Sequence, residues 1–81
     1  MRKMAEENET IEINTRYITL GQVIKLANIF ESGGMIKVFL RDKGVLVNNE
    51  LEHRRGRKLY PNDVVEVENI GTYTVTEKAS N

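Results

Sequence analysis

The residues with the clearest chemical potential form a short basic run, Arg54-Arg55-Gly56-Arg57-Lys58. Four cations within five residues repel one another, so the run gains little from folding unless carboxylates or a phosphate backbone lie opposite it. Guanidinium groups donate paired hydrogen bonds to phosphate oxygens, which favours a polyanion as the ligand. The alternative is an ordinary solvated loop, and we consider polyanion binding the better interpretation.

A second group of cations is predicted on a helix over residues 34–43. Lys37 and Arg41 are four residues apart and therefore share one face of this helix, and Lys43 lies at its end. A Ser-Gly-Gly sequence precedes the helix, and the N–H groups of Gly33 and Gly34 at a helix start would favour an anion. The same glycines could only turn the chain between two antiparallel helices, and both interpretations stay open.

The remaining polar residues do not predict catalysis. The chain has no Cys and one His, which excludes a thiol nucleophile and a metal site built from Cys or from several His. His53 lies beside the basic run and has no nucleophile as partner. Glu50 and Glu52 fit a solvated strand edge better than a pair of catalytic carboxylates. We therefore expect no enzyme, no bound metal and no cofactor.

Two tyrosines have side chains that can stack on unpaired bases, Tyr17 and Tyr60. Tyr60 lies between Leu59 and Pro61, where a ring can seal the edge of a small core. We therefore expect both tyrosines to be partly buried packing residues and do not place them among the predicted ligand contacts.

The charge is distributed unevenly along a chain that is neutral overall. The 81 residues include 12 basic and 12 acidic side chains. Residues 37–58 hold seven cations and three acids, whereas residues 59–81 hold one lysine and four acids. We therefore expect one basic and one acidic face, of which the basic face attracts a polyanion while the acidic remainder discourages unspecific binding.

The elements that must position these residues form one small α+β domain. Apolar alternation or β-branched composition predicts strands at residues 10–15, 45–47, 50–52, 64–68 and 72–76. Helical spacing predicts a first helix that begins after Thr19 and ends at the Ser-Gly-Gly sequence, and a second helix that ends at Gly44. The predicted core positions are Leu20, Val23, Ile24, Ala27 and Phe30 in the first helix and Met35, Ile36, Phe39 and Leu40 in the second.

The ends of the chain are predicted to lie outside this domain. Residues 1–9 are charged and lack periodicity, which predicts a disordered arm, with the domain over residues 10–77 and a frayed end at 78–81. The basic N-terminus is not followed by the apolar stretch of a secretory signal. We therefore expect a cytoplasmic monomer that has no membrane partner.

Residues 19–68 resemble the S-four-type RNA-binding domain family, also called the αL motif. Residues 44–50 are similar to the family's G-x-V-x-V-N-G strand and turn, and residues 59–67 to its P-G-D-x-V-x-V strand entry. Asn49 and Asn62 stand where the family has Gly, and Asn is the residue that next best tolerates the same backbone. Residues 18–25, 32–37 and 54–59 also resemble segments of the small stand-alone bacterial members.

The resemblance implies two short helices packed on a small, curved, mostly antiparallel sheet. It also implies a non-catalytic protein that docks a basic face on structured RNA, with ribosomal or transfer RNA as ligand and the ribosome as an expected partner. The alternative is a protein-interaction adaptor with a small β-grasp-like sheet, whose surface would include Glu66 and Glu68. The predicted nucleic-acid-binding residues are Gly33, Gly34, Lys37, Arg41, Lys43, Arg54, Arg55, Arg57 and Lys58.

Overall fold

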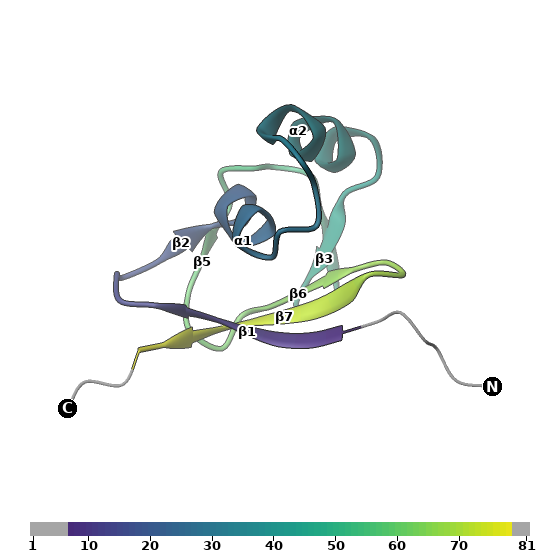
Figure 1. The fold of residues 1–81 in the computed structure, drawn as a ribbon. Helices are drawn as coiled ribbons and strands as arrows, with labels where there is room; N and C mark the ends of the chain where they lie inside the picture. Colours follow the sequence, from purple (N-terminus) through teal and green to yellow (C-terminus); the bar gives the residue numbers. More distant parts are fainter. Residues whose placement is uncertain (1–6, 79–81) are drawn as a thin grey trace.

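The computed structural model describes residues 7–78, which form two helices, a five-stranded sheet and a two-stranded ladder (Figure 1). The predicted α+β class is confirmed, and both helices lie on the same face of the sheet (Figure 1). In chain order the elements are β1 (Glu7–Ile13), β2 (Ile18–Thr19), α1 (Leu20–Leu26), α2 (Gly33–Asp42), β3 (Val45–Val47), β4 (Glu50–Glu52), β5 (Lys58–Leu59), β6 (Val64–Val67) and β7 (Gly71–Glu77).

The five-stranded sheet has the strand order β1-β7-β6-β3-β4 and is antiparallel except between β1 and β7. The parallel ladder joins Glu7 to Gly71 and Ile13 to Glu77. Residues 7–9 were predicted as part of an arm but belong to β1, because backbone pairing with β7 needs no apolar side chains. Lys78, predicted as frayed, donates its backbone N–H to the Ile13 carbonyl at 2.8 Å. Residues 1–6 and 79–81 lie outside the described residues.

The hydrophobic core fills the space between the sheet and the helices. Strands β1, β3, β6 and β7 contribute alternate side chains to it, because successive residues of a strand point to opposite faces. Tyr73 is the largest of these side chains and is 1% exposed. The buried apolar residues are Ile11, Ile13, Ile18, Leu20, Val23, Ile24, Ile36, Leu40, Val45, Val47, Leu59, Val65, Val67, Tyr73 and Val75.

Helix α1 is shorter than predicted, and in α2 one residue that was predicted to face the core is exposed. Helix α1 ends at Leu26, before the Ser-Gly-Gly sequence, because Asn28 adopts a left-handed conformation with φ of 59°. Ala27 and Phe30 therefore lie beyond the helix, although both still pack partly buried against the core. In α2, Met35 was predicted to face the core but is 48% exposed, since the buried face of that helix is set by Ile36 and Leu40.

Asparagines in left-handed conformations also shape the turns of the sheet. Asn49 and Asn62 have φ values of 71° and 85°, which confirms that they can replace glycine at these turns. The side chain of Asn48 joins two turns, since its Nδ2 donates to the Asp63 carboxylate at 3.1 Å and its Oδ1 accepts from the Val64 N–H at 3.0 Å. The predicted helix stop at Gly44 is confirmed, with φ of 76°.

Candidate nucleic-acid interface

The basic loop of residues 53–57 is attached by its backbone to the start of α1. The Leu20 N–H donates to the Arg57 carbonyl and the Gly21 N–H to the Arg55 carbonyl, both at 2.9 Å. These bonds satisfy two of the N–H groups that a helix leaves unpaired in its first turn. The two-stranded ladder of β2 and β5 continues the same attachment by pairing Thr19 with Lys58. The loop and α1 therefore act as one structural unit.

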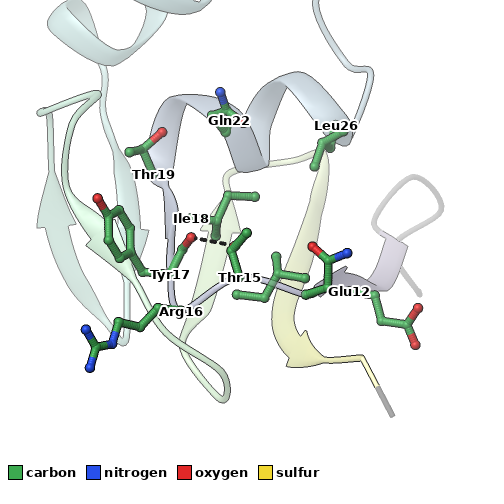
Figure 2. Close-up of a pocket in the computed structure, with 10 residues that line it drawn as sticks. Glu12, Thr15, Arg16, Tyr17, Ile18, Thr19, Gln22 and Leu26 are labelled. Carbon is green, nitrogen blue, oxygen red and sulfur yellow. Dashed lines mark hydrogen bonds between the residues drawn. The ribbon is translucent and has the colours of Figure 1, made fainter. Parts of the chain in front are cut away.

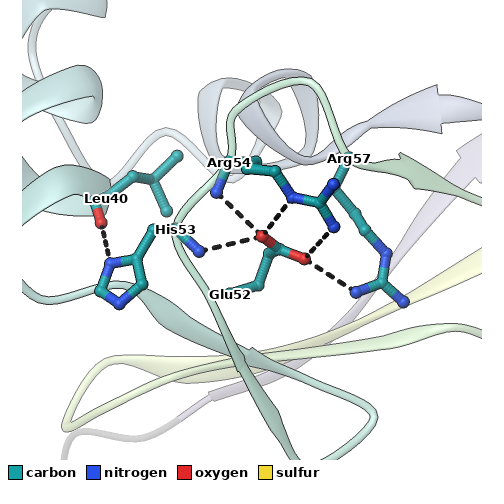
Figure 3. A network of polar contacts seen from close by, with 5 residues as sticks. All are labelled: Leu40, Glu52, His53, Arg54 and Arg57. Carbon is teal, nitrogen blue, oxygen red and sulfur yellow. Dashed lines mark hydrogen bonds and ion pairs between the residues drawn. The ribbon is translucent and has the colours of Figure 1, made fainter.

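A buried carboxylate organises this loop (Figure 3). The side chain of Glu52 is 8% exposed and forms ion pairs with Arg54 at 3.0 Å and Arg57 at 2.9 Å. It also accepts hydrogen bonds from the backbone N–H groups of His53 at 3.1 Å and Arg54 at 3.0 Å. The prediction that Glu52 lies on a solvated strand edge is therefore wrong. Glu52, two residues before Arg54, supplies the carboxylate that offsets the repulsion within the basic run.

The same contacts control the protonation of Glu52. Hydrogen bonds from the Arg54 guanidinium are the largest cause that lowers the pKa of Glu52, and they hold it far below its usual range. Burial opposes this effect, while the Arg54 N–H and the Arg57 side chain lower the pKa further. Glu52 is therefore ionised at neutral pH and neutralises part of the charge of Arg54 and Arg57.

His53, the first residue of the loop, forms a hydrogen bond with α2. Its Nδ1 lies 2.7 Å from the Leu40 carbonyl oxygen, which can only accept, so Nδ1 carries the proton in this contact (Figure 3). A Cβ at Gly44 would lie 2.9 Å from both the Glu52 carbonyl oxygen and the His53 ring. The loop thus packs closely against the end of α2, and His53 has a structural contact there.

A groove with cationic walls lies between the two helices and the loop. It has a volume of about 210 Å³ and is lined by Gly21, Gln22, Lys25, Gly33, Ile36 and Arg55. None of these lining residues is acidic. Lys25 and Arg55 are exposed, and neither forms an ion pair with any residue between 7 and 78. Lys37 is exposed one helical turn after Gly33 and therefore lies on the same side of α2.

The other predicted site residues lie away from this groove or are already paired. Arg41 forms an exposed ion pair with Asp42 at 3.3 Å. Lys43 lines a separate hollow together with Glu66 and Glu68, on the acidic part of the surface. Lys58 places its Nζ 4.8 Å from the centroid of the Tyr17 ring. Only part of the predicted set therefore comes together in the groove.

The two glycines at the start of α2 line different hollows. Gly33 lines the groove, and no atom lies within 4 Å of the place where its Cβ would be. Gly34 lines a different hollow of about 510 Å³, whose walls include Met35 and Val38 on the outer side of α2. The side chain of Ser32 accepts the Met35 N–H at 3.3 Å, so the helix start already has a cap.

The polar groove residues that were not among the predicted contacts are Gln22 and Lys25. The available signal was the helix-start segment over residues 18–25, which resembles the stand-alone family members and contains both. Gln22 also lines a larger hollow of about 580 Å³ on the other side of α1 (Figure 2). That hollow is formed mainly by residues 12–19, with Leu26 from α1 at its edge (Figure 2).

Within residues 7–78, neither helix is long and apolar enough to span a membrane. The same residues contain no group of three or more His, Cys, Asp or Glu side chains that could hold a metal ion.

Comparison with known proteins identifies the family and agrees with the fold. Residues 11–76 match the model of the family described as S4 domain, so the chain belongs to this family, the RNA-binding family that its motifs resemble. The chain is also similar to a protein of Bacillus subtilis (strain 168) named "Probable ribosome maturation protein RlbA". The two are 57% identical over 65 residues, which cover 80% of this chain and 92% of that protein. No solved structure matches the chain.

Proposed function

We propose that this protein is a non-catalytic RNA-binding protein that docks on structured RNA through phosphate contacts at the groove. The observation that carries the proposal is that Lys25 and Arg55, which form no ion pair within residues 7–78, lie on groove walls that contain no carboxylate. The glycines at positions 21 and 33 leave the groove free of bulky side chains, so a phosphate backbone can approach closely. Because phosphates carry no sequence information, the shape of the RNA selects the docking position.

Ribosomal RNA is the ligand that the comparisons favour. The similar Bacillus protein is named as a ribosome maturation protein, which supports a ribosome-related role for this chain. We therefore propose that the groove contacts ribosomal RNA in a ribosomal particle and that transfer RNA is not the main ligand.

The test compares exposed cations of the groove with an exposed cation outside it. The double variant Lys25→Ala/Arg55→Ala removes the groove cations, and Lys43→Ala removes a cation beside Glu66 and Glu68. We expect the double variant to lose at least tenfold in affinity for a structured ribosomal RNA fragment and to stop co-sedimenting with ribosomal particles. Lys43→Ala should keep both properties. Unchanged affinity in a folded double variant would refute the proposal.

The salt dependence of binding counts the phosphates that the groove neutralises. Each neutralised phosphate contributes roughly −0.7 to −0.9 to the slope of log affinity against log salt concentration. If Lys25, Lys37 and Arg55 each contact one phosphate, the slope should be roughly −2 to −3. A slope near zero would show that the groove does not bind the RNA backbone.

A protein-interaction adaptor is the second candidate, and one surface favours it. The hollow on the outer side of α2 has apolar walls from Phe30, Met35, Val38 and Phe39, and Met35 and Val38 are each about half exposed. Apolar side chains gathered at the surface favour a protein partner. A partner that stays bound after nuclease treatment, and is lost in Val38→Asp, would support the adaptor function.

A further inference from the structure

The ladder of β2 and β5 brings two exposed tyrosine rings together on the solvent side. Ile18 pairs with Leu59, and both of these side chains are buried. Tyr17 precedes Ile18 and Tyr60 follows Leu59, so in this antiparallel register the two tyrosines lie opposite each other on the exposed face. Tyr17 is 38% exposed and Tyr60 46% exposed, so both rings are partly buried, as expected, and each also keeps an accessible surface.

The two rings and a lysine form a defined cluster, which we call the tyrosine face (Tyr17, Lys58 and Tyr60). The ring centroids of the tyrosines are 6.1 Å apart and the ring planes are tilted by 56°. The Lys58 Nζ lies 4.8 Å from the centroid of the Tyr17 ring. Tyr17 also lines the hollow that Leu26 borders, so the tyrosine face adjoins that hollow (Figure 2).

The backbone on both sides of the tyrosine face is held in place. The Tyr60 N–H donates to the Asp63 carboxylate at 2.8 Å, and the Asp63 N–H donates back to the Tyr60 carbonyl at 2.9 Å. The Thr15 hydroxyl donates to the Tyr17 carbonyl at 2.9 Å (Figure 2). The backbone that carries the rings is therefore fixed before binding. Stacking a ligand on the rings costs the protein little additional conformational entropy.

The basic loop connects the tyrosine face to the groove along the chain. Lys58 follows Arg57, whose carbonyl accepts the Leu20 N–H, and Arg55 reaches into the groove two residues earlier. An RNA strand with a phosphate at Arg55 can therefore continue along the loop toward the tyrosines. Aromatic rings beside cations are the usual platform for unpaired bases, because every base has a face that stacks on a ring.

We propose that the tyrosine face binds an unpaired nucleotide of the RNA, with the base stacked on Tyr60 or Tyr17. The exposed Lys58 side chain then moves from the Tyr17 ring to the phosphate of that nucleotide, since its contact with the ring at an exposed site is weak. This inference rests on the proposed function and adds a selectivity to it. The protein would prefer structured RNA that carries an unpaired base beside a helix over a fully paired duplex.

The experiment measures affinity for two RNAs that have the same number of phosphates, a hairpin with unpaired purines in its loop and a blunt duplex. Tyr17→Leu and Tyr60→Leu keep an apolar side chain but remove the ring. We expect each to lower affinity for the hairpin about tenfold, the effect of removing one stacking ring, and to leave affinity for the duplex within twofold. Tyr17→Phe and Tyr60→Phe should retain the preference for the hairpin. Leu51→Ala, which trims an exposed apolar side chain on β4, serves as the control.

Tyrosine fluorescence of the unmodified protein gives a second measurement that does not depend on variants. The chain has no Trp and three Tyr, of which Tyr73 is buried, so changes in emission report on Tyr17 and Tyr60. We expect the hairpin to quench the emission and the duplex to leave it nearly unchanged.

The outcomes separate this inference from the proposed function. Equal quenching by both RNAs, or equal losses of affinity in the leucine variants, would overturn the tyrosine face while leaving the groove in place. If the unmodified protein bound neither RNA, both proposals would fail. A protein partner whose capture survives nuclease and depends on the two rings would also overturn it, because the face would then bind protein.

Discussion

Neighbouring arginines of one loop have opposite roles. Arg54 and Arg57 are ion-paired with the buried Glu52 and help to hold the loop, whereas Arg55 lines the groove and has no ion pair with any residue between 7 and 78. The comparison shows that clustered charge in a sequence does not measure the charge offered to a ligand. A single carboxylate decides which cations stabilise the fold and which stay available.

The largest expected effect is a loss of stability when Glu52 no longer forms ion pairs with Arg54 and Arg57. Glu52→Gln removes the charge that Arg54 and Arg57 contact and replaces one acceptor oxygen by a donor. We expect the free energy of unfolding to fall by about 2 kcal/mol, because hydrogen bonds to charged groups contribute about 1.5–3 kcal/mol. Urea unfolding at pH 7 measures the change.

Glu50→Gln is the matched control for this variant. Glu50 lies on the same strand but is exposed, so its stability should stay close to that of the unmodified protein. Equal effects of the two substitutions would show that Glu52 does not organise the loop.

Acid should remove the same stabilisation reversibly. Folding lowers the pKa of Glu52 below the usual value of about 4.5, so its contribution is fully present above that pH. As the pH falls below about 4.5, the unfolded state takes up the proton first and the contribution is progressively lost. Urea midpoints between pH 7 and pH 3 should therefore converge for the unmodified protein and Glu52→Gln. A constant gap between them would contradict the assignment.

Separate substitutions of Arg54 and Arg55 test whether the first stabilises the loop and the second binds RNA. Arg55→Ala should weaken RNA binding about three- to tenfold and reduce the magnitude of the salt slope by roughly 0.7–0.9, with the urea midpoint unchanged. Arg54→Ala should lower the urea midpoint instead, because it removes the largest contact of Glu52. A larger loss of RNA affinity in Arg54→Ala than in Arg55→Ala would reverse the roles proposed here.

The smallest effect is expected from the two glycines at the start of α2. Gly33→Ala and Gly34→Ala meet no atom closer than 3.8 Å, so each should change stability by less than about 1 kcal/mol. Only Gly33 lines the groove, so only Gly33→Ala should weaken RNA binding, by about two- to threefold. Equal affinities of the two variants would indicate that the RNA backbone does not approach Gly33.

Most of the fold could be predicted from the sequence because it depends on local patterns. Apolar alternation and β-branched composition located the five strands of the main sheet but not the two-residue strands β2 and β5. The helical spacing of Leu20, Val23 and Ile24 located the first helix and its buried face. The end of that helix was wrong because the left-handed conformation of Asn28 is a property of one residue, and the glycines farther on are the stronger general signal. The exposure of Met35 depends on how α2 rotates against the core, which spacing alone does not determine.

The candidate site could be predicted only in part, because it depends on contacts between segments distant in sequence. The basic run was identified, but the pairing of Arg54 and Arg57 with Glu52 required the loop to fold back on the end of β4. Lys25 joins Arg55 in the groove because backbone bonds attach the loop to α1, thirty residues away. In the sequence, Tyr17 precedes Ile18 and Tyr60 follows Leu59. Only the β2–β5 pairing shows that the two tyrosine rings lie side by side.

The parallel ladder between β1 and β7 has a consequence for how the protein is made. This ladder joins the first described strand to the last, so its contacts have the greatest separation along the chain. Closing such a long loop costs entropy that local contacts do not, which delays the step during folding. A growing polypeptide therefore cannot complete the sheet until β7 has left the ribosome, and the buried side chains of Ile11 and Ile13 must wait for it.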